Sequence, residues 1–337
     1  MKIGFLGAGA LGAYYGGRMA ETGQEVGFVA RNETLEALRT TGVTLIDDNE
    51  ETSVVSNVAA AESFEELAET MGGLDVIINA TKSLPGNDSF PDVSGIKTAD
   101  GKQVPIVTLH NSVEVPQLVA EQYGEQNVIP GIVRGYFVHK GPATAQFLPG
   151  MKVLNIGTFD RAQDSHAYRV ACELSEALVA AGFKSEVWDD IFVEIWSKAM
   201  FVTPTGALGA LAHQPLGFLR EEGAEGKPGL RSTLEGLMRE YEAAARAHGV
   251  GLPEDIVEKT MALTDKQPDS ATSSMQRDIR DGLPNELDAQ VGAVRRMAAR
   301  VGVPTPLHDM MQGALEGQIK AQAEGRQIKA QAEGRQG

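Results

Sequence analysis

The stretch Lys2-Ile3-Gly4-Phe5-Leu6-Gly7-Ala8-Gly9-Ala10-Leu11-Gly12 decides the fold of this chain. Its first five residues predict a short buried strand, and the residues after the glycines predict a helix that continues to Glu21 and ends at Gly23. Gly7 permits a tight turn, Gly9 lets a pyrophosphate approach the backbone, and Gly12 lets helix and strand pack closely. A second strand over residues 25–29 completes the order expected of a dinucleotide-binding unit. The alternative is a glycine-rich turn that binds nothing.

The residue after the second strand indicates which dinucleotide is bound. NAD-preferring sites place Asp or Glu about 20 residues after the glycines, where the carboxylate accepts a hydrogen bond from the ribose 2′-hydroxyl. This chain has Arg31 instead, and a guanidinium suits the dianionic 2′-phosphate of NADP. We therefore predict NADP(H) as the cofactor. An exposed surface arginine without a ligand is the alternative.

The composition argues against several classes of protein. With 337 residues, 42% of them hydrophobic and 23% charged, the chain is long enough for two domains and has the make-up of an ordinary soluble protein. Its net charge of −16 argues against a protein that tracks nucleic-acid phosphates. Cys172 is the only cysteine, which excludes an internal disulfide or a zinc cluster of cysteines. The histidines show no HxxxH or HExxH spacing, so we predict no metal site.

No segment predicts a membrane span or a targeting signal. The N-terminus forms the first strand rather than a signal peptide, and no apolar run approaches ~18 residues. We therefore expect a cytoplasmic protein with neither a membrane nor a nucleic acid as partner.

Strands and helices alternate over the first half of the chain. This order predicts a parallel, doubly wound sheet whose ligands lie beyond the carboxyl ends of its strands, and Lys82 and Asn111 each follow such a strand. We expect helices over residues 34–42, 63–70 and 169–181, and strands over 43–46, 52–55, 74–80, 104–109, 127–132, 135–138, 151–156 and 184–188.

From Asp189 to Gly317 the periodicity is almost entirely helical. The predicted fold class is α/β, with an N-terminal Rossmann domain over residues 1–188, an all-helical domain over 189–317 and a polar tail over 318–337. In that tail the sequence from Gln318 to Arg326 recurs unchanged from Gln327 to Arg335. We interpret it as a solvated helical or frayed extension, with an oligomer contact, such as that of a homodimer, as the alternative.

The first helix of the second domain, over residues 189–202, carries a lysine inside its apolar stripe. At about 100° per residue, Lys198 falls on the same stripe as Ile191 and Ile195. An ammonium group that loses hydration becomes a better proton donor near neutral pH. The alternative is that Lys198 reaches the surface and pairs with Glu194. Thr203-Pro204-Thr205-Gly206 then ends or kinks the helix and leaves two hydroxyl groups beside it.

Two polar sites later in the chain are ambiguous on spacing alone. Pro284 predicts the first turn of a helix with Leu287 on its buried face, which places Glu286 in that turn. A first-turn carboxylate is favoured by the helix dipole, and Ser273 or Ser274 suits the N-cap of a helix that begins near residue 275. Helix capping therefore explains these residues at least as well as a functional role does.

Taken together, these motifs resemble the ketopantoate reductase (2-dehydropantoate 2-reductase) family, over nearly the whole chain except the repeated tail. The features that carry the resemblance are the motif from Gly7 to Gly12, Arg31, Thr81-Lys82, Leu109-His110-Asn111, Trp196-Ser197-Lys198, and Ser273-Ser274-Met275 with Asp278-Ile279-Arg280 and Glu286. The resemblance implies a Rossmann domain followed by an all-helical domain, with the active site in the cleft between them.

The resemblance also implies a role for each residue. Lys198 hydrogen-bonds the ketone oxygen of the substrate and supplies the proton, and Glu286 orients the lysine and the developing hydroxyl group. Ser274 holds the polar end of the substrate, while Lys82 and Asn111 line the nicotinamide side. The implied cofactor-binding set is Gly7, Ala8, Gly9, Ala10, Leu11, Gly12, Arg31, Lys82 and Asn111, and the substrate-binding set is Ser274, Asn111, Thr203 and Thr205.

The chain departs from the family pattern near the lysine. Members usually carry asparagines where this chain has Val202 and Gly206, and a third asparagine corresponds to Leu216. Thr203 and Thr205 can substitute as hydroxyl donors, but a pocket of changed shape is the simpler interpretation. A site without these polar partners discriminates against a substrate with a polar tail, because that tail would lose its hydrogen bonds on burial.

We therefore predict an NADPH-dependent reductase that converts a small 2-oxo acid to the 2-hydroxy acid, an oxidoreductase of the type that acts in pantothenate biosynthesis. One alternative keeps the enzyme and changes its substrate to another ketone or an imine, or makes it a 3-hydroxy acid dehydrogenase of related architecture. Another is a regulatory module that binds NADP(H) without catalysing a reaction.

Overall fold

A computed structural model describes residues 1–84, 90–223 and 228–333 of the chain. These residues fold into two compact units. The first contains a sheet and comprises residues 1–82, 90–110 and 115–192. The second is helical and comprises residues 193–223 and 228–333 together with two short segments from earlier in the chain, residues 83–84 and 111–114.

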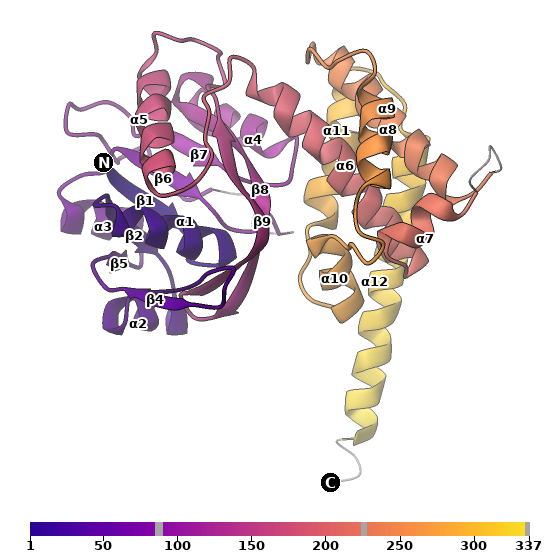
Figure 1. Cartoon of the computed structure of the whole chain (residues 1–337), viewed down its shortest axis with the longest axis horizontal. Coiled ribbons are helices and arrows are strands. Elements are labelled where there is room, and N and C mark those ends of the chain that lie inside the picture. The colour runs from indigo at the N-terminus through magenta and orange to yellow at the C-terminus, as the bar shows by residue number, and fades with distance from the viewer. Residues whose placement is uncertain (85–89, 224–227, 334–337) are drawn as a thin grey trace. The chain divides into compact units, whose positions relative to one another are not determined.

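A single sheet organises the first unit (Figure 1). Among the described residues it has nine strands in the order β4-β3-β9-β8-β7-β6-β1-β2-β5. The block from β8 to β5 is parallel throughout, whereas β8 pairs with β9 and β3 with β4 in antiparallel fashion. The strands are β1 (Lys2–Leu6), β2 (Glu25–Val29), β3 (Val43–Ile46), β4 (Thr52–Val55), β5 (Ala59–Ala61), β6 (Val76–Asn79), β7 (Ile106–Thr108), β8 (Val128–Gly141) and β9 (Thr144–Ile156).

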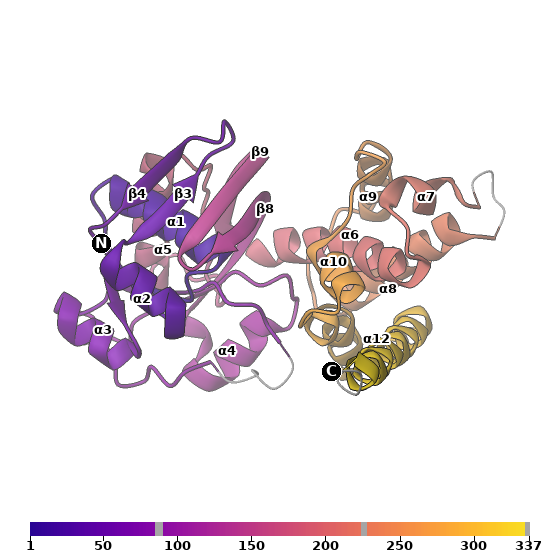
Figure 2. The same cartoon turned by 90° about the horizontal axis from the view of Figure 1, so that it is seen from below.

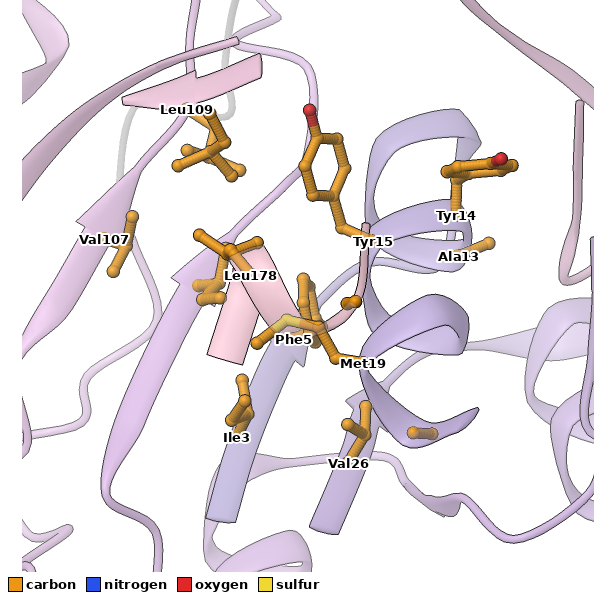
Figure 3. Packing of buried hydrophobic residues seen from close by; sticks show 14 of the residues in the cluster. Ile3, Phe5, Ala13, Tyr14, Tyr15, Met19, Val26, Val107, Leu109 and Leu178 are labelled. Atoms are coloured by element: carbon orange, nitrogen blue, oxygen red, sulfur yellow. The ribbon is translucent and has the colours of Figure 1, made fainter. Parts of the chain in front are cut away.

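Helices cover both faces of this sheet, because successive strand residues point to opposite sides. On one face Ile3 and Phe5 of β1 pack with side chains of α1 and α5, as Figure 3 shows around Tyr15, Met19 and Leu178. On the other face Ile77 packs in a second cluster with side chains of α3 and α4. The helices of this unit are α1 (Ala10–Glu21), α2 (Asn32–Thr40), α3 (Phe64–Met71), α4 (Val115–Tyr123) and α5 (His166–Ala180), with the short 3-10 helix η1 (Glu125–Asn127).

The doubly wound α/β architecture is therefore confirmed, with corrections in detail. The strand expected in two pieces, residues 127–132 and 135–138, is the single strand β8, whose register shifts between Arg134 and Tyr136. Gly135 accommodates this irregularity instead of ending the strand, since a Cβ there would approach the carbonyl oxygen of Met151 to 2.6 Å. The sheet is consequently mixed at its β8–β9 side rather than parallel throughout.

Three further elements differ from the expectation. The short strand β5 was not predicted, because its three alanines have little strand propensity. The helix α4 was not predicted either, because Pro116 in its first turn was not recognised as a helix start. Residues 184–188 form isolated bridges from Lys184 and Val187 to β9 rather than a regular strand.

The second unit is built from helices (Figure 2), and α12 extends beyond the others (Figure 1). Its central helix α8 has a buried stripe at Leu234, Leu237, Met238 and Tyr241, and packs against α7, α9, α11 and α12. The helices are α6 (Ile191–Ala212), α7 (Leu216–Glu221), α8 (Leu230–Ala247), α9 (Ile256–Asp265), α10 (Ser274–Asp281), α11 (Ala293–Arg300) and α12 (Pro306–Glu333), with the π-helical segment η2 (Asp288–Gly292) before α11. In the described part of the chain no helix is long and apolar enough to cross a membrane.

The helix that carries Lys198 continues through Pro204, so of the two outcomes expected at residues 203–206, an end or a kink, the end is wrong. Proline removes one backbone donor from the helix. Buried contacts on both sides, at Met200 and Ala207, keep the helix in place, and the Thr205 hydroxyl donates to the carbonyl oxygen of Phe201 at 2.7 Å.

The helix expected to begin at Pro284 begins instead at Leu287. The Asn285 side chain accepts a hydrogen bond from the backbone N–H of Leu287 at 3.2 Å, which sets the start three residues after the proline. The first copy of the repeated tail is helical, the first of the two forms expected for it, and it continues α12 without a break from Pro306.

Candidate functional site

The glycine loop between β1 and α1 has the geometry of an anion site. Gly7 has a φ of +86°, which favours glycine, and a Cβ at Gly12 would collide with the carbonyl oxygen of Gly7. Gly9 is the N-cap of α1 and has open space around the position of a Cβ. No acidic side chain lies in the first turn of α1. The loop therefore leaves the helix N-terminus accessible to a pyrophosphate, and Ala8, Ala10 and Leu11 form the rest of it.

The turn after β6 lies beside this loop. Strands β1 and β6 pair in parallel, with Leu6 opposite Asn79, so their carboxyl ends lie together. The Asn79 amide oxygen accepts hydrogen bonds from the backbone N–H and the hydroxyl of Thr81, at 3.2 and 2.7 Å. A Cβ at Gly7 would lie 2.9 Å from the Thr81 side chain. This turn places exposed Lys82 at the same sheet edge as the glycine loop.

Arg31 lies at the N-cap of α2, directly after β2. Its side chain is exposed, and within the described residues its guanidinium has no hydrogen bond or ion pair. Because β2 is the neighbour of β1 in the sheet, the guanidinium is at the correct end of the sheet to meet a group extending from the glycine loop. It is thus available to bind an anion.

In the helical unit, Lys198 is anchored by an amide. Its Nζ donates a hydrogen bond to Asn111 Oδ1 at 2.6 Å. The lysine is half-buried on α6, next to buried Ile195 and Ala199, and Asn111 is the first residue of the segment 111–114 that follows β7. Two residues expected to function together are therefore in direct contact, although 87 positions separate them.

Two of the described residues hold Glu286 in place. It is 8% exposed, and its Oε1 accepts a hydrogen bond from the backbone N–H of Ser83 at 3.0 Å. Its Oε2 lies 3.5 Å from the amide nitrogen of Gln290, a fully buried residue of the π-helical segment η2. Such segments place side chains that a regular helix would direct elsewhere, and they are common at functional sites. The predicted first-turn position of Glu286 is wrong, since the residue precedes the helix.

Ser273, not Ser274, caps α10: its Oγ accepts the backbone N–H of Gln276 at 3.0 Å. Ser274 is the first helical residue, is half-buried, and forms no hydrogen bond through its hydroxyl to any described residue. A Cβ at Gly206 would collide with Ser273 Oγ, so glycine is what lets the N-terminus of α10 pack against α6. An asparagine at residue 206 would displace this cap.

The two threonines assigned to substrate binding are buried inside α6. Thr203 is 1% exposed, and the Thr205 hydroxyl already donates to a helix carbonyl. Their role toward a substrate stays a prediction, and their burial gives it no support.

The sequence pattern missed Glu114, which is 3% exposed at the end of the segment 111–114. Arg296 Nε donates to its carboxylate at 2.8 Å and Arg300 Nη2 at 3.4 Å, both from α11. Burial by itself lowers the pKa of Arg296, but hydrogen bonds to Glu114 and Asp288 outweigh it and hold the pKa above its usual range. No local pattern marks Glu114, because its partners lie 182 and 186 residues away.

Comparisons with known proteins agree with this arrangement. The ketopantoate reductase PanE/ApbA family model matches residues 3–161, and the model of the C-terminal part of the same family matches residues 190–318. A 2-dehydropantoate 2-reductase from Mesorhizobium japonicum is 29% identical, with 92% of this chain and 95% of that protein covered.

Solved structures give the same result. The PanE/ApbA family ketopantoate reductase from Ralstonia eutropha is 25% identical and has a TM-score of 0.78, covering 96% of this chain and 100% of that one. The ternary structure of D-mandelate dehydrogenase with NADH and anilino(oxo)acetate has a TM-score of 0.78 at 18% identity, covering 95% and 99%, and shares the fold alone. Since the two family models together span the glycine loop, Lys198 and Glu286, the chain belongs to the ketopantoate reductase PanE/ApbA family.

Proposed function

We propose that this protein is an NADPH-dependent reductase that converts a small 2-oxo acid to the corresponding 2-hydroxy acid. The observation that carries the proposal is the contact between Lys198 Nζ and Asn111 Oδ1, because it orients a cationic proton donor from α6 with a neutral amide.

Residues 1–188 form the dinucleotide-binding domain in this proposal. The open space above Gly9, the accessible N-terminus of α1 and the exposed guanidinium of Arg31 fit a pyrophosphate and a 2′-phosphate. Lys82 and Asn111 act on the nicotinamide side. The reduced dinucleotide, when bound, supplies the hydride that reaches the carbonyl carbon.

Residues 189–317 form the substrate domain. Lys198 donates a hydrogen bond and then a proton to the carbonyl oxygen as negative charge develops there. Glu286, fixed by Ser83 and Gln290, orients the lysine and the new hydroxyl group. The Ser274 hydroxyl, which no described residue engages, holds the polar end of the substrate.

The substrate class follows from the relatives and from Val202 and Gly206. Relatives that are 29% and 25% identical to this chain are named 2-dehydropantoate 2-reductases, so ketopantoate is the first compound to test. The absence of amides at these two positions of α6 favours 2-oxo acids with less polar tails over ketopantoate. We further propose that the enzyme works in the cytoplasm.

The experiment is a screen of 2-oxo acids with NADPH and NADH in parallel, followed by kinetics of Lys198→Ala on the best substrate. We expect turnover to fall by at least ~100-fold while NADPH affinity stays nearly unchanged. Near-normal turnover in this variant would refute the role of Lys198. Tight NADPH binding without oxidation by any 2-oxo acid would instead identify a non-catalytic binding module.

A further inference from the structure

The first copy of the repeated tail packs beside the segment that leads to Glu286. The family model for this part of the chain ends at residue 318, where the repeat begins. Beyond that point, Ile319, Ala323 and Arg326 of α12 line a groove whose other side is formed by Ile279, Leu283 and Asn285. Figure 1 shows α10 and α12 side by side.

Arg326 makes the polar contact of this groove. Its Nη1 donates hydrogen bonds to the carbonyl oxygens of Asp281 and Gly282, at 3.3 and 3.1 Å. These carbonyls lie at the C-terminus of α10, where the helix supplies no further N–H donors and where a cation is favoured. A Cβ at Gly282 would collide with the guanidinium, so Arg326 lies directly against the helix end.

The helix end is connected closely to the candidate site. Only residues 283–285 separate Gly282 from Glu286. Asn285, which lines the groove, also accepts the hydrogen bond from Leu287 N–H that starts the next helix. Ser274 is at the other end of α10. Residues 274–286 therefore carry both Ser274 and Glu286, and Arg326 contacts this segment near its middle.

We propose that Arg326 is a positioning residue, through which the first copy of the repeat orders the segment that carries Ser274 and Glu286. The proposal rests on the proposed reductase function and adds a chain-specific element to it. Without Arg326 the last carbonyls of α10 turn to water, residues 282–286 gain freedom, and Glu286 leaves its productive orientation for part of the time. Small displacements of this kind lower turnover strongly.

The duplication supplies the matched control. Arg326→Ala and a chain ending at Gly317 remove the contact, whereas Arg335→Ala and a chain ending at Arg326 alter only the second copy. We expect kcat to fall by about 10- to 100-fold in the first two variants, with NADPH affinity unchanged, and kcat to stay within about twofold of the wild type in the last two. Arg326→Lys, which keeps a cation and a donor, recovers part of the loss.

Hydrogen–deuterium exchange of residues 283–287 tests the contact without reference to activity. We expect faster exchange of the Leu287 amide in Arg326→Ala than in Arg335→Ala. Equal exchange overturns the proposal whatever the activity of the wild type. Faster exchange with unchanged kcat also overturns it, since the segment would then not set the rate. If the wild type reduces no 2-oxo acid, the proposed function fails, and this exchange comparison still reports separately on the contact.

Discussion

Arg296 donates a hydrogen bond from Nε to the carboxylate of Glu114 at 2.8 Å, joining α11 to the segment 111–114 at a residue that is only 3% exposed. Arg300 adds a second, longer contact. The same segment begins with Asn111, which accepts the hydrogen bond from Lys198. The ion pair therefore anchors the residue that orients the proposed acid.

Glu114→Gln tests this anchor. The substitution removes the buried carboxylate to which Arg296 and Arg300 donate. We therefore expect the free energy of unfolding to fall by about 1–3 kcal/mol. Turnover falls, because Asn111 loses its fixed position. Denaturant unfolding and steady-state kinetics measure both effects, and Glu125→Gln on exposed η1 is the control. If Glu114→Gln is destabilised but keeps wild-type turnover, Glu114 stabilises the fold without affecting catalysis.

Alanine substitutions at two glycines of the glycine loop are expected to have different effects, one on stability and the other on NADPH binding. A Cβ at Gly12 meets the Gly7 carbonyl oxygen, so Gly12→Ala costs about 1–3 kcal/mol of stability through overpacking. A Cβ at Gly9 meets nothing, so Gly9→Ala folds with nearly wild-type stability but obstructs the approach of a pyrophosphate. Thermal unfolding and fluorescence titration with NADPH distinguish the two variants. If Gly9→Ala binds NADPH as tightly as the wild type, the glycine loop does not bind the cofactor.

Arg31→Ala tests the preference for NADP. Charge-assisted hydrogen bonds to a phosphate contribute about 1.5–3 kcal/mol, so the Kd for NADPH rises by roughly 10- to 100-fold and the Kd for NADH changes little. Isothermal titration with both dinucleotides provides the comparison. Arg39→Ala, on the same helix but paired with Glu66, is the matched control. Equal losses for both dinucleotides would contradict a phosphate contact.

His110 predicts a pH dependence of stability. Burial lowers the pKa of His110 from 6.5 to about 4. Between these values the unfolded chain binds a proton that the native protein does not, so the free energy of unfolding falls as the pH decreases from 6.5 to 4, by up to about 3 kcal/mol. Urea unfolding across this range shows a shallower slope for His110→Gln. Exposed His139→Gln keeps the wild-type slope; a slope unchanged by His110→Gln would exclude the assignment.

The elements that could be predicted are those encoded by neighbouring residues. The strand, turn and helix from Lys2 to Glu21 follow from glycine spacing and apolar pattern, and β2, β3 and β4 have the expected bounds. The position of Lys198 among apolar residues follows equally from helical periodicity. Ser63 caps α3 as its spacing to Glu66 predicts.

The remainder depends on contacts between distant residues. Pro204 ends a helix by its local chemistry, yet packing at Met200 and Ala207 maintains α6. Nothing near Ser83 or Glu114 in the sequence indicates that these residues contact side chains more than 180 positions later. The π-helical segment around Gln290 has only five residues, which is too few to show a hydrophobic periodicity in the sequence.

The membership of residues 83 and 111–114 in the helical unit limits how this protein can be dissected. A fragment starting at Val193 would lack the backbone donor for Glu286, the amide for Lys198 and the carboxylate for two arginines. Cutting the chain at this point would thus yield a helical bundle without three of its native hydrogen-bond partners. Chimeras that exchange cofactor modules between relatives must carry these two short loops along with the helices, not with the strands that precede them.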